Sequence, residues 1–225
     1  MILAAEGDEH VALELVTRAK KALVDSGLLT KDFSTAQDIL ERRKNLLRCT
    51  TGSAKLDSFL KGGIEDQAIT EIASEFGSGK SQICYTLCVT ANMSPDKKDF
   101  GGNVIFIDTE NTFRAERIFQ IAEHSGINDP DDILRKIYVC KIYNTSHLEV
   151  IIQDLGKSIE QYNAKRVIVD SIIALHRAEF TGRGTLADRQ QRLNIMLHKL
   201  SRLSEVHNIA VAVTNQVQSQ PDDFF

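Results

Sequence analysis

The sequence predicts an α/β protein in which a mostly parallel, doubly wound sheet is flanked by helices. From residue 68 onward, short apolar runs alternate with longer amphipathic stretches. The runs are rich in Val and Ile and are apolar on both faces, which is typical of buried parallel strands. The amphipathic stretches have the length of the helical crossovers that join parallel strands. The 225 residues, of which 42% are hydrophobic, are enough for one globular domain and a short appendage.

Five apolar runs are the expected strands: residues 68–73, 103–108, 136–140, 166–170 and 209–214. Two stretches between them carry core-facing stripes at helical spacing. The first stripe consists of Leu148, Ile151, Ile152, Leu155, Ile159 and Tyr162, and the second of Leu193, Met196, Leu197, Leu200 and Leu203. Residues 9–24 also show helical spacing, and the helix they predict is too small to form a domain alone.

Composition limits the classes of function. The 27 basic and 31 acidic residues give a net charge of −4, so contact with nucleic acid requires a local basic patch rather than a global field. The four cysteines form no CxxC pair, and a reducing cell interior is the simplest setting for them. The apolar runs are too short for a membrane span, and the N-terminal segment is too acidic for a signal peptide, so we expect no membrane partner.

The segment that joins strand 68–73 to the next helix, SEFGSGKS (74–81), has the pattern of a phosphate-binding loop. Gly77 and Gly79 supply the backbone freedom that lets amides point at phosphate oxygens, and the helix N-terminus adds partial positive charge. Lys80 is expected to bridge the β- and γ-phosphates, and the Ser81 hydroxyl to ligate Mg²⁺. The expected nucleotide-binding residues are Ser74, Glu75, Phe76, Gly77, Ser78, Gly79, Lys80, Ser81 and Gln82.

One residue departs from the GxxxxGK[ST] pattern, because Ser74 replaces the first glycine. A serine would be strained there if the position required a positive φ. Hydrolysis is then affected more than binding, and restoring glycine is expected to raise the rate. A plain Gly-Ser turn followed by an unrelated lysine is the alternative, and the placement between a buried strand and a helix disfavours it.

Polar residues follow three of the expected strands and would emerge beside this loop in a parallel sheet. Asp170 fits a Walker B carboxylate that holds Mg²⁺ through water. Glu110, two residues beyond its strand, is placed to act as general base or to orient the attacking water. Gln216 is placed to sense the γ-phosphate. Acidic residues at strand ends also serve as helix N-caps, and this alternative stays open for Glu110 and Asp170.

Several separated motifs resemble the RecA/RadA recombinase family, and within it archaeal RadA and its eukaryotic strand-exchange relatives. They are EFGSGKSQ, FIDTENTFRAERI, IVDSI, HRAEFTGRGTLADRQQRL and VTNQV, in that order. The resemblance implies a RecA-like P-loop ATPase core that uses ATP and Mg²⁺. It assigns Glu110, Lys80 and Gln216 to catalysis, Ser81 and Asp170 to the metal, and Arg117 to stacking on the adenine.

The resemblance also implies DNA contacts. The TGRG segment (181–184) falls in the family's first DNA-binding loop, where Arg177, Gly182, Arg183 and Gly184 would meet single-stranded DNA. Residues 176–202 hold six Lys or Arg against two Asp or Glu, so the segment is locally basic. A solvated basic face is the alternative for its helical part.

Phe33 and Ala36 match the family's FxxA polymerisation motif, in which the aromatic ring and the alanine fill pockets on the next subunit. Such a head-to-tail contact generates a helical filament or a ring. By itself Phe33 is an apolar residue in a linker that could equally pack on its own domain. Recombination mediators are further partners implied by the resemblance.

The resemblance divides the chain into three parts: a remnant of a helix-hairpin-helix domain (1–30), a linker with the polymerisation motif (31–48), and an ATPase core that is incomplete at its C-terminus (49–225). An exposed sheet edge is therefore expected. The implied function is a DNA-dependent ATPase that performs homologous pairing and strand exchange, also with duplex DNA, in recombination and repair. We do not expect strand exchange from this polypeptide alone.

Two other functions stay open. One is a recombinase paralogue or mediator that binds nucleotide with weak or no hydrolysis. The other is a clock-type or helicase-type ATPase, which would leave the FxxA, TGRG and VTNQV segments without a role. The expected location is the cytoplasm with nucleoid association, or the nucleus in a eukaryote.

Overall fold

The computed structural model describes residues 9–25, 33–91, 93 and 102–217. The chain divides into two units, Met1–Asn45 and Leu46–Phe225. In the first unit, helix α1 spans Glu9–Asp25 and helix α2 spans Ala36–Lys44. The predicted N-terminal helix is thus confirmed. Thr35 caps α2 and forms a reciprocal capping box with Asp38, which fixes where this helix begins.

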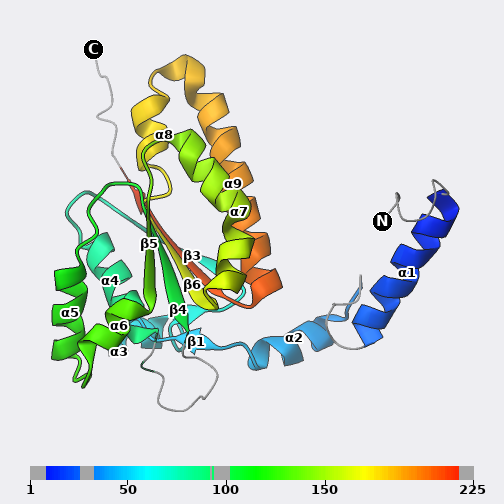
Figure 1. Cartoon of the computed structure of the whole chain (residues 1–225), viewed down its shortest axis with the longest axis horizontal. Coiled ribbons are helices and arrows are strands. Elements are labelled where there is room, and N and C mark those ends of the chain that lie inside the picture. The colour runs from blue at the N-terminus through cyan, green and yellow to red at the C-terminus, as the bar shows by residue number, and fades with distance from the viewer. Residues whose placement is uncertain (1–8, 26–32, 92, 94–101, 218–225) are drawn as a thin grey trace. The chain divides into compact units, whose positions relative to one another are not determined.

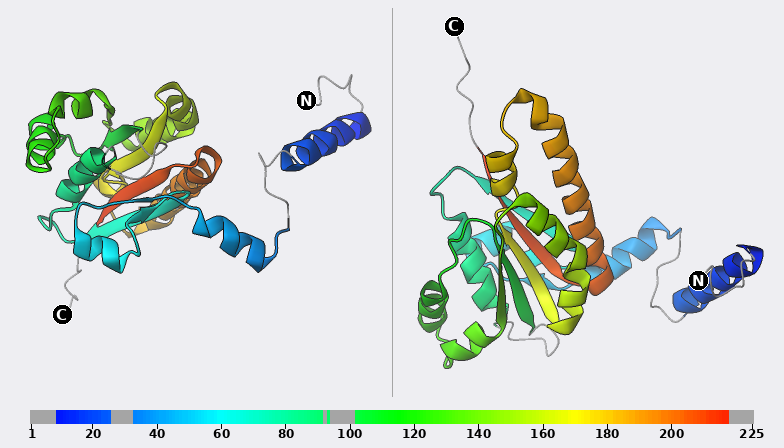
Figure 2. Two further views of the ribbon diagram at one scale, coloured as in Figure 1. Left: turned by 90° about the horizontal axis from the view of Figure 1, so that it is seen from below. Right: turned by 45° about the horizontal axis from the view of Figure 1, so that its top comes forward.

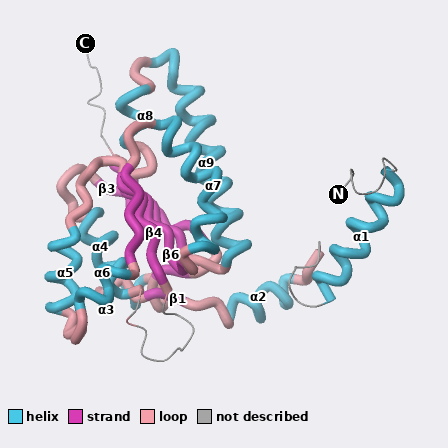
Figure 3. The backbone as a smooth tube through the Cα atoms, viewed as in Figure 1, coloured by secondary structure: helices cyan, strands magenta, loops and turns pink. Residues whose placement is uncertain are grey.

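The second unit is built on a five-stranded parallel sheet in the order β3-β7-β6-β4-β5 (Figures 1 and 3). Its strands are β3 (Ala68–Ser74), β4 (Asn103–Asp108), β5 (Ile137–Lys141), β6 (Ala164–Asp170) and β7 (Ala210–Gln216). All five strands expected from the sequence are present, and the α/β doubly wound architecture is confirmed. Strands β3 and β5 are the edges of the described sheet.

Helices cover both faces of the sheet (Figures 1 and 2). Alternate residues of the strands face opposite cores: in β4, Phe106 packs with α4 to α6, whereas Ile107 packs with α7 and α9. This alternation explains why the strands are apolar throughout. The helices are α4 (Lys80–Thr90), α5 (Ala115–His124), α6 (Pro130–Arg135), α7 (Thr145–Gln161), α8 (Ala174–Glu179) and α9 (Leu186–His207).

The two predicted apolar stripes lie on α7 and α9 and pack into one core cluster with β4, β6 and β7. Most of the stripe residues are buried, and Ile151, Tyr162, Leu197 and Leu203 are partly buried at its border. Their interpretation as core residues is confirmed. None of the helices among the described residues has both the length and the apolar composition needed to cross a bilayer.

A small hairpin lies at the amino-terminal edge of the sheet. It pairs β1 (Arg48–Cys49) with β2 (Ile64–Glu65), and helix α3 (Ala54–Phe59) lies between them in the chain. Arg166 on β6, only 4% exposed, anchors this region. Its guanidinium donates to the Leu87 carbonyl at the end of α4 (2.5 Å) and to the Cys49 sulfur (3.1 Å). A buried cation thus joins the hairpin to the end of α4.

Asp66, which follows β2, is buried near this cation. Burial raises the pKa of its carboxyl to about 6, although the charges of Arg166 and Lys165 oppose the shift. The folded protein therefore holds the proton more tightly than the unfolded chain does. The contribution of protonated Asp66 to the stability of the folded state is fully present below the unfolded pKa of 3.8. This contribution is lost as the pH rises toward about 6.

We predict that Asp66→Asn removes this contribution to the pH dependence of the free energy of unfolding, because the amide does not titrate. Relative to the parent, the variant should gain stability as the pH rises from about 4 to about 6. Urea unfolding at several pH values measures the difference, and Asp131→Asn on the solvent-exposed start of α6 is the matched control. A constant difference between parent and Asp66→Asn across this range contradicts the prediction.

Candidate nucleotide-binding site

The loop between β3 and α4 has the backbone that a phosphate cradle requires. Gly77 (φ 74°) and Gly79 (φ 93°) both adopt left-handed conformations, and helix α4 begins at the next residue, Lys80. A Cβ atom at either glycine would meet no heavy atom within 4 Å, so the constraint is conformational rather than one of space. The predicted loop geometry is therefore present, with a helix N-terminus directly behind it.

Lys80 lies back over the loop. Its Nζ donates to the carbonyl oxygens of Ser74 (3.1 Å) and Glu75 (2.7 Å). Phe76 is 84% exposed at the tip of the loop. Gln82, one turn into α4, accepts a hydrogen bond from Arg117 Nε of α5 (2.8 Å). Arg117, the predicted adenine contact, is thus fixed against the helix that starts at the loop.

Asp108 at the end of β4 organises the loop that carries Glu110. Its carboxylate accepts backbone N–H groups from Glu110 (3.2 Å), Thr112 (3.2 Å) and Phe113 (3.0 Å). Asp108 is therefore the capping carboxylate of this loop, and Glu110 is left at its surface. Glu110 is the residue predicted for catalysis, whereas the capping role of Asp108 was not predicted.

The Glu110 carboxylate lies in an acidic setting. Partial burial raises its pKa, and the negative charges of Asp170 and Asp108 act in the same direction. A hydrogen bond with Ser171 and the positive charge of Lys80 oppose the shift. These interactions place Glu110, Asp170 and Lys80 within one electrostatic neighbourhood. A raised pKa makes a carboxylate a better proton acceptor near neutral pH.

Asp170, at the end of β6, is 3% exposed. One carboxylate oxygen, Oδ1, accepts a hydrogen bond from the Thr214 hydroxyl on β7 (2.5 Å). The other, Oδ2, is buried and has no hydrogen-bond partner among the described residues. A buried carboxylate oxygen without a partner is costly unless a cation or water completes it, so this atom fits a magnesium-bound water. Thr214 was not predicted; its only signal was a polar residue that ends an apolar run.

The sheet order brings the predicted strand ends together. Strands β3, β7, β6 and β4 are consecutive neighbours with parallel register, so their carboxyl ends share one edge. Ser74 is paired with Gln216, and Asp108 with Asp170. Glu110, Asp170 and Gln216 at the strand ends and Lys80 at the start of α4 therefore lie at one edge of the sheet. Within the described residues, no group of three His, Cys, Asp or Glu side chains is arranged to hold a metal ion.

Other predicted residues lie elsewhere. The TGRG segment leads into a short 3₁₀ helix, Arg183–Thr185, and Gly182 has φ 90°. Arg177 lies on α8 and is half-buried, and its Nη1 has no partner among the described residues. Phe33 lies in the first unit and is 93% exposed. Ala36 is the first residue of α2 and is exposed.

Comparison with known proteins agrees with this geometry. The family model described as Rad51 matches residues 42–224, which include every strand end described above. The DNA repair and recombination protein RadA of Cenarchaeum symbiosum (strain A) is 47% identical over 216 residues, which are 96% of this chain and 54% of RadA. This chain belongs to the Rad51 family. It spans about half the length of the curated relative that it matches.

In this Rad51-family chain, Ser74 takes the first glycine position without strain. Ser74 is the last residue of β3 and has an extended backbone. The backbone strain that was expected to impair hydrolysis is therefore absent. Its hydroxyl is hydrogen-bonded to the Ser78 hydroxyl, which also donates to the Glu75 carbonyl (2.8 Å). Val217 N donates to the Ser74 carbonyl (3.0 Å). Ser74 thus closes the base of the phosphate loop and joins it to the end of β7.

We predict that Ser74→Gly and Ser74→Ala behave alike, because both remove the hydroxyl bridge and neither relieves strain. One hydrogen bond is worth about 0.5–1.5 kcal/mol, so nucleotide affinity should change by roughly 2- to 12-fold in both variants. Titration with a fluorescent ATP analogue measures this change. An effect confined to Ser74→Gly would mean that the position does strain a non-glycine residue.

Proposed function

We propose that this chain binds Mg²⁺-ATP at the edge of the sheet and hydrolyses it as the core of a DNA-dependent recombinase. The observation that carries the proposal is the Asp170 carboxylate, which is buried at the sheet edge with one oxygen unpaired among the described residues. The P-loop backbone and the electrostatic coupling of Lys80 with Glu110 support it.

Separate main-chain and side-chain groups would hold the phosphates and the base of the nucleotide. The amides of residues 75–79, Lys80 and the α4 N-terminus would bind the phosphates, and Gln82 and Arg117 lie farther along, where the base would be. Magnesium, when bound, supplies positive charge to the phosphate oxygens. Ser81 and Asp170 are the residues proposed to hold it, the latter through water.

Glu110 would take the proton of the attacking water, or orient that water, in front of the γ-phosphate. Its raised pKa suits this role, and Asp108 fixes the loop that presents it. Gln216 ends β7 beside Ser74, where it would report the presence of the γ-phosphate to the following residues. Those residues, 218–225, lie outside the described part of the chain.

DNA binding is proposed for the loop after α8. Arg177, Gly182, Arg183 and Gly184 would meet the phosphates of single-stranded DNA, and duplex DNA would enter in strand exchange. Gly182 has a positive φ, which suits a tight turn at this point. The local excess of six basic over two acidic residues within 176–202 supports an anionic partner.

Polymerisation is proposed through the exposed Phe33 and through Ala36, which would enter pockets of the next copy in a filament or a ring. The exposed edges of the described sheet offer hydrogen-bonding groups to an added strand. Mediator proteins that carry the same motif would compete for those pockets.

A second candidate is a paralogue that binds nucleotide without turnover. The replacement of the first P-loop glycine by Ser74 is the observation that favours it. The measurement that separates the two is ATPase activity with and without single-stranded DNA. Stimulation by DNA supports the recombinase, and binding without turnover supports the paralogue.

We predict that Glu110→Gln keeps ATP affinity and lowers turnover by about 10²-fold or more, because the amide cannot accept the proton. Lys80→Ala, as the matched variant, should abolish ATP binding, because it removes the cation from the phosphate loop. Nucleotide titration and phosphate release measure the two effects. If Glu110→Gln hydrolyses ATP like the parent, the catalytic role of Glu110 is excluded.

We predict that Phe33→Glu converts oligomers into monomers, because a carboxylate cannot enter an apolar pocket without a large desolvation cost. Light scattering measures the mass. Phe59→Glu is the matched control, since Phe59 is a similarly exposed aromatic (82%) outside the motif. An unchanged mass for Phe33→Glu would remove the polymerisation proposal.

A further inference from the structure

An exposed aromatic pair follows β5 at the carboxyl edge of the sheet, and the site described above does not use it. Tyr143 is 78% exposed, and its ring is nearly parallel to that of His147, with centroids 5.9 Å apart and planes 7° apart. Asn144 caps α7 between them by accepting the His147 backbone N–H (2.7 Å). The cap fixes the backbone turn that directly follows Tyr143.

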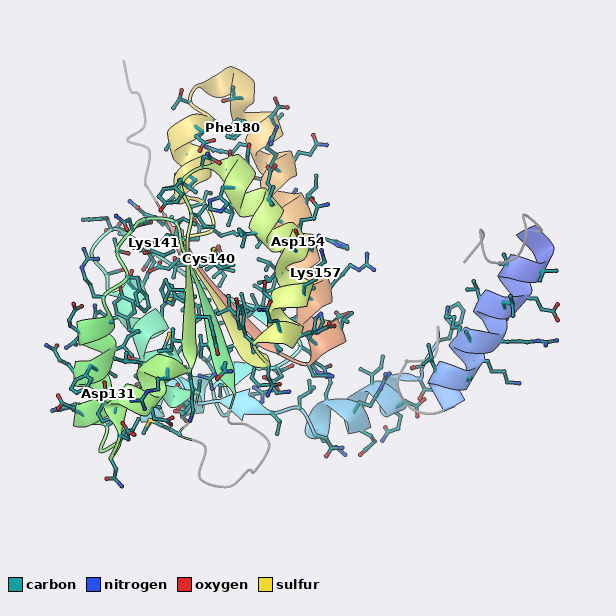
Figure 4. The ribbon with its side chains drawn as sticks, viewed as in Figure 1. Asp131, Cys140, Lys141, Asp154, Lys157 and Phe180 are labelled. Carbon is teal, nitrogen blue, oxygen red and sulfur yellow. The ribbon has the colours of Figure 1, made fainter. Side chains whose placement is uncertain are left out.

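A cation lies on the same side of the chain as this ring. Lys141 and Tyr143 are exposed, and Ile142 between them is 5% exposed, so the alternation directs the two outer side chains away from the core. Lys141 ends β5 and is paired with Asp108, which places it at the edge that also carries Glu110. Figure 4 shows Lys141 and Cys140 near this end of β5.

The aromatic pair is tied to the glycine loop proposed to bind DNA. The Thr145 backbone N–H and hydroxyl both donate to the Glu179 carboxylate of α8, at 2.9 and 2.5 Å. Glu179 lies three residues before Gly182, where the loop turns. The turn that carries Tyr143 is thus joined by hydrogen bonds to the helix that leads into the loop.

Two acidic groups near the pair, Glu179 and Glu149, are already engaged. Glu179 accepts from Thr145, and Glu149, one helical turn beyond Thr145, pairs with Arg192 of α9 at 2.8 Å. Arg192 in turn lies over the ring of Phe180, 5.3 Å from its centroid. Lys141 and the Tyr143 ring are both exposed, and together they offer a positive charge and an aromatic face to an anionic, aromatic ligand.

We infer that Tyr143, backed by His147, stacks on one unpaired base of single-stranded DNA while Lys141 contacts the adjoining phosphate. Every base offers a π face, so such a contact tolerates any sequence and extends the grip of the glycine loop by one nucleotide. The inference deepens the proposed DNA-binding function and rests on it. Duplex DNA should not use this contact, because its bases are already stacked on one another.

The test uses the full chain, Mg²⁺-ATP and an oligo-dT that carries one 2-aminopurine, whose fluorescence reports stacking. Tyr143→Ala should weaken binding about tenfold, the order of magnitude expected for one base stacked on an aromatic side chain, and should lose the stacking signal. Tyr143→Phe should keep both. Lys141→Gln should weaken binding and lower the slope of log affinity against log salt by about one. Phe59→Ala removes an exposed aromatic outside this region and should change neither.

The outcomes separate this contact from the proposed function. If the parent binds the oligonucleotide and Tyr143→Ala binds it equally with an unchanged stacking signal, the inference is overturned and the proposed function stands. If the parent binds no single-stranded DNA in the presence of Mg²⁺-ATP, both are overturned. If Tyr143→Ala lowers the mass in light scattering while the stacking signal of the bound oligonucleotide persists, Tyr143 contacts another copy of the chain and the base contact is overturned.

Discussion

Parallel pairing of β3, β7, β6 and β4 is the constraint on which the rest of the structure depends. Because the strands run the same way and in register, the polar residue that ends each one is delivered to a single edge. None of these residues contacts its partners through sequence proximity. A shift of one residue in any strand would turn its polar end toward a packed face and separate the groups proposed to handle the phosphates.

The site combines groups that the fold has satisfied with groups that it has left incomplete. The Asp108 carboxylate accepts hydrogen bonds from three backbone N–H groups and acts as a structural cap. Only one oxygen of the Asp170 carboxylate accepts a hydrogen bond, from Thr214, and the other is buried without a partner among the described residues. Leaving a buried polar atom unpaired costs free energy, and such a cost is commonly found where a ligand completes the coordination. The difference between these two neighbouring carboxylates gives each its role.

The two ends of the sheet differ in how charged groups are arranged. At the amino-terminal edge, the buried Arg166 joins the hairpin and the end of α4, and burial keeps the pKa of Asp66 high. At the carboxyl edge, acidic groups cluster around Lys80, and exposed cations such as Lys141 lie farther out. The chain as a whole is acidic, so contact with a polyanion has to be local.

The sequence by itself determined the strands, the helical stripes, the phosphate loop and the identity of the polar strand ends, because hydrophobic period and glycine placement are local signals. Only the tertiary structure decided which carboxylate is a cap, that Ser74 is unstrained and bonded to Ser78, and that Thr145 holds Glu179. These are contacts between side chains brought together by packing, and no local pattern encodes them. The pairing of β3 with β7 and its register were likewise decided by the tertiary structure, because runs that are apolar on both faces carry no alternation that selects a neighbour or a register.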